Sequence, residues 1–177
     1  MDGINSRRAR FWQALRKWVL YTLLLLVCTA LQTMPGLFAV GRFKPFFILA
    51  VCLAVAVYEG EFYGALFAVA GGLLWDYTGG RTVGMLAILL MGECFLASVL
   101  VQLYLKAKPL NLYLLAAACG LLTLSTDFLF YYLMPGYAGP ARYYFGVLVP
   151  EALVSALFIL PLAALVRRIH SRFTVQD

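Results

Sequence analysis

The chain has 177 residues, of which 64% are hydrophobic and only 12% are charged. A soluble domain has about 45–50% apolar and about 25% charged residues, so this composition excludes a soluble protein and indicates an integral membrane protein. The formal net charge of +6 does not indicate nucleic-acid binding, because the basic residues cluster at the chain ends and between apolar runs, as membrane-flanking charges do.

Six uncharged runs in the sequence approach the length of about 20 residues that an α-helix needs to cross a bilayer. The second and third runs are short, at about 14 residues or about 21 Å each, and only Tyr58-Glu59-Gly60-Glu61 separates them. They are therefore either two helices or one broken span. The six runs cover roughly residues 18–38, 45–58, 62–76, 84–105, 110–133 and 146–166.

Loop charge favours six helices over five, because Lys and Arg accumulate on the cytoplasmic side of a membrane protein. Six helices with a cytoplasmic N-terminus place ten basic residues inside and four outside, whereas the fused alternative places seven on each side. The sequence thus predicts an all-α bundle of six transmembrane helices over residues 18–166, with both termini cytoplasmic. Residues 1–17 form a basic segment, either an amphipathic helix on the inner surface or a disordered flank, and residues 167–177 form a basic tail.

Small residues recur every four positions along the third predicted helix, at Gly60, Gly64, Ala68 and Gly72. Such a stripe lets another helix backbone approach closely, so that van der Waals contact drives association in lipid. The neighbouring helix belongs either to a partner protein or to this same six-helix bundle, and packing inside the bundle is the simpler interpretation.

Three acidic residues lie within or near the ends of the predicted spans, where a charge at the bilayer centre costs about 2.5–3.5 kcal/mol. Glu93 is the deepest of them. Asp127 and Glu151 fall at similar depth on the outer half of the fifth and sixth helices, and Arg142 in the joining loop can reach toward either. One interpretation is that these four residues form a polar docking point for a periplasmic or membrane partner. A buried, hydrogen-bonded structural pair and a proton relay are the alternatives.

The sequence shows no recognisable catalytic or metal-binding pattern. His170 is the only histidine and lies in the basic tail, where we expect solvent or lipid headgroups around it rather than a nucleophile. There is no Walker-type glycine loop and no HExxH motif, so the sequence predicts a protein that is not an enzyme and has no cofactor. Four cysteines stand inside apolar runs without metal-ligand spacing, which predicts small buried hydrophobic side chains. They are Cys28, Cys52, Cys94 and Cys119.

The stretch "GGLLWDYTGGRTVG", residues 71–84, places polar groups between two glycine-rich runs. Gly80 and Gly84 permit a sharp reversal between the third and fourth helices, because glycine tolerates backbone angles that other residues resist. Asp76 is placed to accept hydrogen bonds from free backbone N–H groups at the start of the fourth helix, or to pair with Arg81. A capped membrane hairpin is therefore expected here.

This stretch also carries a family resemblance. The run Gly64, Gly72-Leu73-Leu74, Asp76, Gly80 and Gly84, in a small basic-flanked protein whose second helix opens with Pro45, resembles the rod shape-determining protein MreD family of bacteria. The similarity continues through Pro150, Pro161 and the terminal "VRRIHSRF". We carry over only the family-signature positions, to which we assign a structural role: Gly72, Asp76, Gly80 and Gly84.

The resemblance implies a multi-pass subunit of the elongation machinery in the bacterial plasma membrane. It implies a non-enzymatic scaffold that binds MreC and works with MreB, RodA and a class B penicillin-binding protein in cell-shape maintenance and sidewall peptidoglycan synthesis. It also implies a six-helix fold similar to the substrate-binding subunits of energy-coupling-factor transporters. The chain length, the six helices and the acids on the outer half indicate an alternative function, a vitamin-binding subunit of such a transporter, and a lipid or undecaprenyl-carrier flippase is a third possibility.

Overall fold

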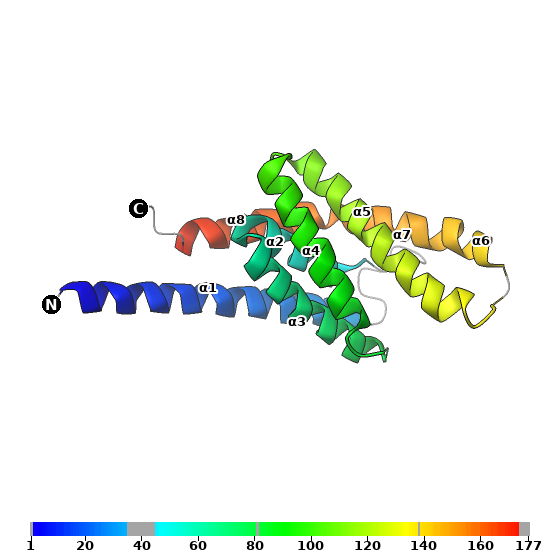
Figure 1. Ribbon diagram of the computed structural model, residues 1–177, viewed down its shortest axis with the longest axis horizontal. Helices are drawn as coiled ribbons and strands as arrows, with labels where there is room; N and C mark the ends of the chain where they lie inside the picture. The colour runs from blue at the N-terminus through cyan, green and yellow to red at the C-terminus, as the bar shows by residue number, and fades with distance from the viewer. Residues whose placement is uncertain (1, 35–44, 81, 138, 174–177) are drawn as a thin grey trace.

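The computed structural model describes residues 2–34, 45–80, 82–137 and 139–173, with side chains from Phe11 onward. Within these residues the chain is all-helical and has no strand, and its helices form six successive segments along the chain (Figure 1). The fifth segment is α5 with η1, and the sixth is α6, η2, α7 and α8 in direct succession. The bounds are α1 (Asp2–Thr33), α2 (Phe47–Glu59), α3 (Glu61–Gly79), α4 (Met85–Leu103), α5 (Pro109–Phe128), η1 (Leu129–Leu133), α6 (Pro140–Tyr143), η2 (Tyr144–Leu148), α7 (Val149–Leu157) and α8 (Ile159–Phe173).

Four helical stretches are long and apolar enough to cross a membrane: Phe11–Thr33, Met85–Leu103, Pro109–Leu133 and Pro140–Phe173. This agrees with the prediction of an all-α membrane protein, and the number of helical segments agrees with the six that were predicted. The start of α1 and the end of α8 lie at the same end of the bundle (Figure 1), which we call the basic end. The cytoplasmic location of both termini stays a prediction.

Helix bounds differ from the predicted spans at several points. The basic N-terminal segment is continuous with α1, and α8 extends through Arg167 and Arg168 to Phe173. The last helical segment begins at Pro140 rather than at residue 146, so Arg142 lies in the short helix α6 and not in a loop. Proline at the first position of α6 suits a helix start, because its missing N–H is one of the groups that a helix leaves unbonded.

The two short apolar runs are separate helices because the backbone turns sharply at Gly60. Its φ of +94° lies in a region that residues with a Cβ rarely adopt, and both α2 and α3 are bounded by it. The helix α2 has 13 residues and is therefore about 20 Å long, shorter than the bilayer core of about 30 Å.

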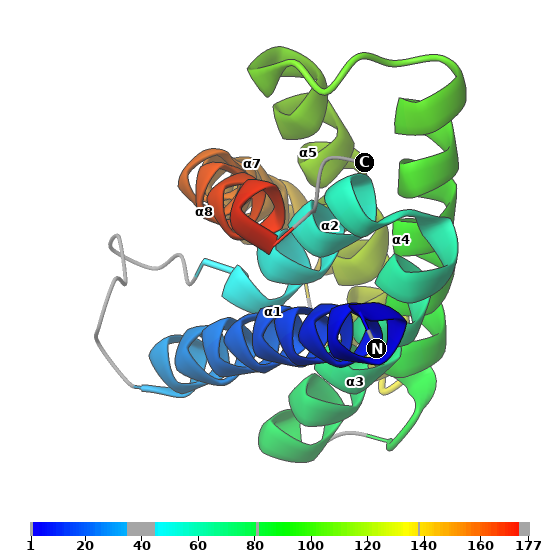
Figure 2. The ribbon, with the colours of Figure 1, turned by 90° about the vertical axis from the view of Figure 1, so that its left-hand side faces the viewer.

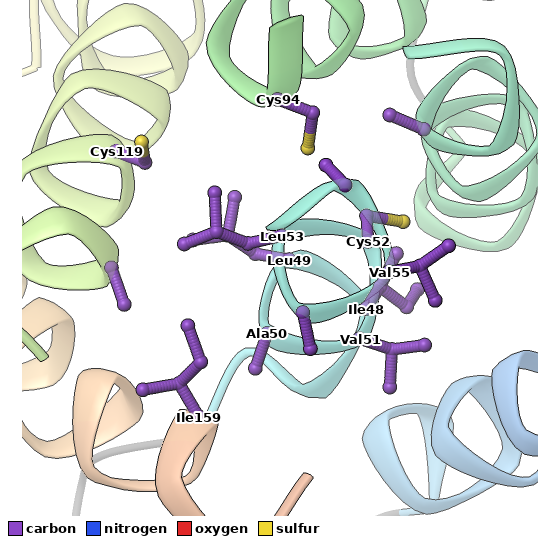
Figure 3. Packing of buried hydrophobic residues seen from close by; sticks show 14 of the residues in the cluster. Ile48, Leu49, Ala50, Val51, Cys52, Leu53, Val55, Cys94, Cys119 and Ile159 are labelled. Carbon is purple, nitrogen blue, oxygen red and sulfur yellow. The ribbon is translucent and has the colours of Figure 1, made fainter. Parts of the chain in front are cut away.

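Helix α2 occupies the centre of the bundle, between α1, α3, α4 and α8 (Figure 2). All ten residues from Phe47 to Ala56 are buried, so α2 has no face toward solvent or lipid over this length. Its side chains radiate toward neighbouring helices, including Cys94 of α4, Cys119 of α5 and Ile159 of α8 (Figure 3). The four cysteines are all free and buried, as predicted.

Small residues of α3 allow its backbone to touch two other helices. A Cβ on Gly64 would overlap the backbone of Ala56 in α2, and a Cβ on Gly72 would overlap the backbone of Ala87 in α4. Ala68 is fully buried, whereas Gly60 stands outside the helix at the break. The structure thus uses Gly64 and Gly72 for packing within the bundle, against two different helices rather than along one stripe.

The substitution Gly72→Ala should destabilise the bundle, because the added methyl group must push α4 away from α3. Overpacking of this kind costs about 1–3 kcal/mol. We expect a lower melting temperature in detergent for Gly72→Ala. Gly92→Ala in α4 is the matched control, since a Cβ at Gly92 meets nothing within 4 Å. Equal melting temperatures for the two variants would contradict the close α3–α4 contact.

Candidate functional site

The α3–α4 hairpin is built around Asp76, whose side chain is fully buried. Its Oδ2 accepts a hydrogen bond from the backbone N–H of Gly84 at 2.8 Å, and its Oδ1 accepts a longer one from Leu86 at 3.4 Å. These are N–H groups at the start of α4, as the sequence predicted for Asp76. Gly80 ends α3 with a φ of +62°, which suits a glycine. The alternative pairing with Arg81 lies outside the described residues.

Tyr131 holds the same hairpin against the end of the fifth helical segment. The backbone N–H of Thr82 donates to the Tyr131 hydroxyl at 2.9 Å, and that hydroxyl lies 3.3 Å from the Thr82 Oγ1. The turn after α3 is therefore fixed by a carboxylate from within and by a phenol from a neighbouring helix.

Glu93 lies apart from the other predicted docking residues. It is 7% exposed, and Thr123 Oγ1 lies 3.0 and 2.9 Å from its two carboxylate oxygens, to which the hydroxyl donates. Glu93 belongs to α4 and Thr123 to α5, so this contact joins two helices. A buried carboxyl with a hydroxyl donor matches the structural alternative for this residue.

Asp127 and Glu151 do come together, from α5 and α7. Both line a pocket of about 360 Å³ at the end of the bundle where α1 ends and α2 begins, opposite the basic end. We call it the acidic pocket. Arg142 is exposed in α6 and is not among the described residues that line it. The other residues of its wall with polar or aromatic side chains are Gln32, Thr33, Phe46, Trp75, Thr78 and Tyr143.

The wall of the acidic pocket is held in place by contacts with its surroundings. Gln32 is fixed through its Oε1, which accepts the backbone N–H of Ile48 at 3.1 Å. The ring of Trp75 packs on Phe46 at a centroid distance of 4.8 Å, and the ring of Tyr143 stacks on Tyr132 at 4.7 Å. Two carboxylates and aromatic rings in a fixed frame suit a cationic or hydrogen-bond-donating group better than an anion.

A second polar cluster, centred on Glu59, was missed by the sequence analysis. The Glu59 side chain is 6% exposed, and its Oε2 accepts a hydrogen bond from Lys17 Nζ at 2.6 Å. Its Oε1 accepts the Tyr21 hydroxyl at 2.7 Å and lies 2.7 Å from His170 Nδ1. The cluster therefore joins α1, α2 and α8 at the basic end.

The expectation that His170 is surrounded by solvent or headgroups is wrong. Its side chain is 30% exposed, contacts Glu59 and packs its ring 6.3 Å from that of Tyr58. Lys17 and Tyr21 share one face of α1 because they are four residues apart, which was the one available signal in the sequence. It could not identify Glu59 and His170, which are distant in sequence, as the partners.

Metal coordination finds no support in the side chains that the structure describes. Within that part of the chain, no three residues of the types His, Cys, Asp and Glu form a group able to hold a metal ion. The acidic pocket contributes two carboxylates, which are hydrogen-bond acceptors and cation partners.

Comparison with models of known protein families matches residues 13–172 to the family described as rod shape-determining protein MreD. The match covers nearly the whole chain, including the hairpin, the Glu59 cluster and the acidic pocket. Neither the curated proteins nor the solved structures provide a match.

Removing the Asp76 carboxylate should destabilise the hairpin. Asp76→Ala leaves the N–H groups of Gly84 and Leu86 without their acceptor in a buried site, which costs about 1–3 kcal/mol. Asp76→Asn keeps one oxygen acceptor and should lose less. We expect the melting temperature in detergent to fall in the order wild type, Asp76→Asn, Asp76→Ala. An unchanged melting temperature for Asp76→Ala would refute this role.

Loss of Glu59 should loosen the basic end of the bundle. Glu59→Ala removes the shared acceptor of Lys17, Tyr21 and His170, and we expect a destabilisation on the order of 2–3 kcal/mol, measured by thermal unfolding in detergent. Glu61→Ala, two residues away, is the control. Glu61 is half-buried at the first position of α3 and accepts a hydrogen bond from Gln102, so its loss should change stability less than the loss of the buried Glu59. Similar losses for both variants would contradict a special role for Glu59.

Proposed function

Because the chain belongs to the MreD family of rod shape-determining membrane proteins, we propose that it is a non-enzymatic scaffold of the rod complex that binds MreC. The family match over residues 13–172 is the observation that carries this proposal. The protein would lie in the bacterial plasma membrane, where it would support sidewall peptidoglycan synthesis. Further contacts with MreB, RodA and a class B penicillin-binding protein are part of the same proposal.

The arrangement of polar groups supports a binding role rather than catalysis. Asp76, Glu93 and Glu59 each connect one helix to another through hydrogen bonds. Asp127 of α5 and Glu151 of α7 line the acidic pocket, whose wall also includes residues of α1, α3, α6 and η2. With both termini cytoplasmic, that pocket would face the periplasm, and we assign the acidic pocket to the contact with MreC.

A vitamin-binding subunit of an energy-coupling-factor transporter is the second candidate. The acidic pocket favours it, since a volume of about 360 Å³ is within the range of small-molecule sites. The two proposals predict that different molecules co-purify with the protein. After gentle solubilisation from the native bacterium, recovery of MreC supports the scaffold, whereas a bound vitamin or a co-purifying ATP-driven transporter module supports the alternative.

Glu151→Ala should weaken MreC binding without loss of folded protein. We expect about tenfold weaker binding, or ~1.4 kcal/mol, in a titration of MreC against the protein in nanodiscs. The reason is that the acidic pocket loses one of its two carboxylates. Glu61→Ala, which removes an acid near the basic end, is the matched control and should bind MreC as the wild type does. A loss of folded yield like that of Asp76→Ala would assign Glu151 a structural role instead.

A further inference from the structure

A second pocket, of about 440 Å³, lies between α2, α5 and α8 toward the basic end. We call it the basic pocket. These three helices contact one another there and are seen from that end in Figure 2. Arg167, Arg168 and Ser171 of α8 supply polar groups to its wall, and Tyr58 of α2 supplies a phenol. Neither the acidic pocket nor the Glu59 cluster includes the two arginines.

The side of α8 that lines this pocket changes from apolar to basic along the helix. Leu160, Ala163 and Ala164 come first, and Arg167, Arg168 and Ser171 follow one to two turns later. These positions are three or four residues apart and therefore share one face of the helix. The alanines leave room between α8 and α5, and the arginines stand about 6 Å further along the axis. A lipid with an apolar chain and an anionic headgroup would match this change along the helix, with its chain beside the alanines and its headgroup beside the arginines.

Charge at this end of the bundle also favours an anion. The acid Glu59 directly follows Tyr58 in the sequence. Its carboxylate oxygens already bond to Lys17, Tyr21 and His170. Pro109, the first residue of α5, lines the pocket, so the positive end of that helix dipole lies beside it. Among the described residues that line this pocket, none is an acid that could pair with the two arginines.

We propose that the basic pocket binds the headgroup of an anionic phospholipid, with its acyl chains along Ala163, Ala164 and Leu112. Arginine guanidinium groups pair with phosphate oxygens through two parallel hydrogen bonds, and basic pockets between membrane helices suit anionic headgroups. Tyr58 would add a hydroxyl donor to the headgroup, whereas the Ser171 hydroxyl donates to the Arg168 carbonyl at 3.1 Å. This site is independent of the proposed contact with MreC, which lies at the opposite end.

The test is native mass spectrometry of the full-length purified protein with dioleoylphosphatidylglycerol and dioleoylphosphatidylcholine in equal amounts. We expect one phosphatidylglycerol to be retained in preference to phosphatidylcholine. Arg167→Gln should reduce the retained fraction at least fivefold, because it removes a phosphate partner. Arg172→Gln should change it less than twofold, since Arg172 lies on the same helix but is not among the residues of this pocket.

A second variant tests the cavity without changing charge. Ala164 is exposed and lines the pocket, so Ala164→Phe should fill the space for the lipid, lower retention severalfold and leave the melting temperature unchanged. Equal loss in Arg167→Gln and Arg172→Gln would overturn the proposal in favour of diffuse attraction to a basic surface. Unchanged retention in Ala164→Phe would exclude the pocket. Displacement of the lipid by millimolar inorganic phosphate would show a phosphate site and overturn the lipid assignment.

Discussion

A short, wholly buried helix imposes the constraint on which this structure depends. Helix α2 spans about 20 Å of a bilayer core of about 30 Å, so its two ends lie at depths where backbone groups need partners within the protein. At its first turn, Ser155 Oγ accepts the N–H of Phe46 and Gln32 Oε1 accepts the N–H of Ile48. At its last turn, Ser98 Oγ donates to the carbonyl of Ala56. Side chains from three other helices therefore add hydrogen bonds at both ends of α2.

The same short helix explains why pockets form at both of its ends. Phe46, just before α2, lines the acidic pocket, and Tyr58, one residue before its end, lines the basic pocket. Helix α1, and α5 together with η1, are longer than α2 and extend beyond it. A recess therefore remains between these longer helices where α2 ends. Packing in the middle and polar recesses at the ends are consequences of one chain segment that is too short to span the bilayer. The two recesses differ in charge, so they suit different molecules.

Much of the fold could be predicted from the sequence because composition and run length report directly on membrane helices. The break at Gly60 and the cap by Asp76 were predictable as well, since each depends on residues close in sequence. The polar contacts between helices could not be predicted. The sequence of a helix shows which of its faces is polar but not which other helix packs on that face. Glu59 and His170 are 111 positions apart, and Glu93 and Thr123 are 30 apart. The small residues of α3 likewise do not form one contact surface, because Gly64 meets α2 and Gly72 meets α4. The sequence shows the small residues but not which helices pack against them.

The acidic residues of this bundle occupy two kinds of place, namely contacts between helices and the wall of the acidic pocket. Asp76, Glu93 and Glu59 each accept hydrogen bonds from groups of the chain itself, and each of these contacts fixes one helix relative to another. Any membrane protein that buries a carboxylate needs hydrogen-bond donors of this kind around it, whatever its function. Asp127 and Glu151 share a pocket wall with aromatic rings, and such a wall is compatible with either of the two proposed ligands, a protein or a small molecule. The proposal of a protein partner at this site therefore rests on membership of the MreD family and not on the shape of the pocket.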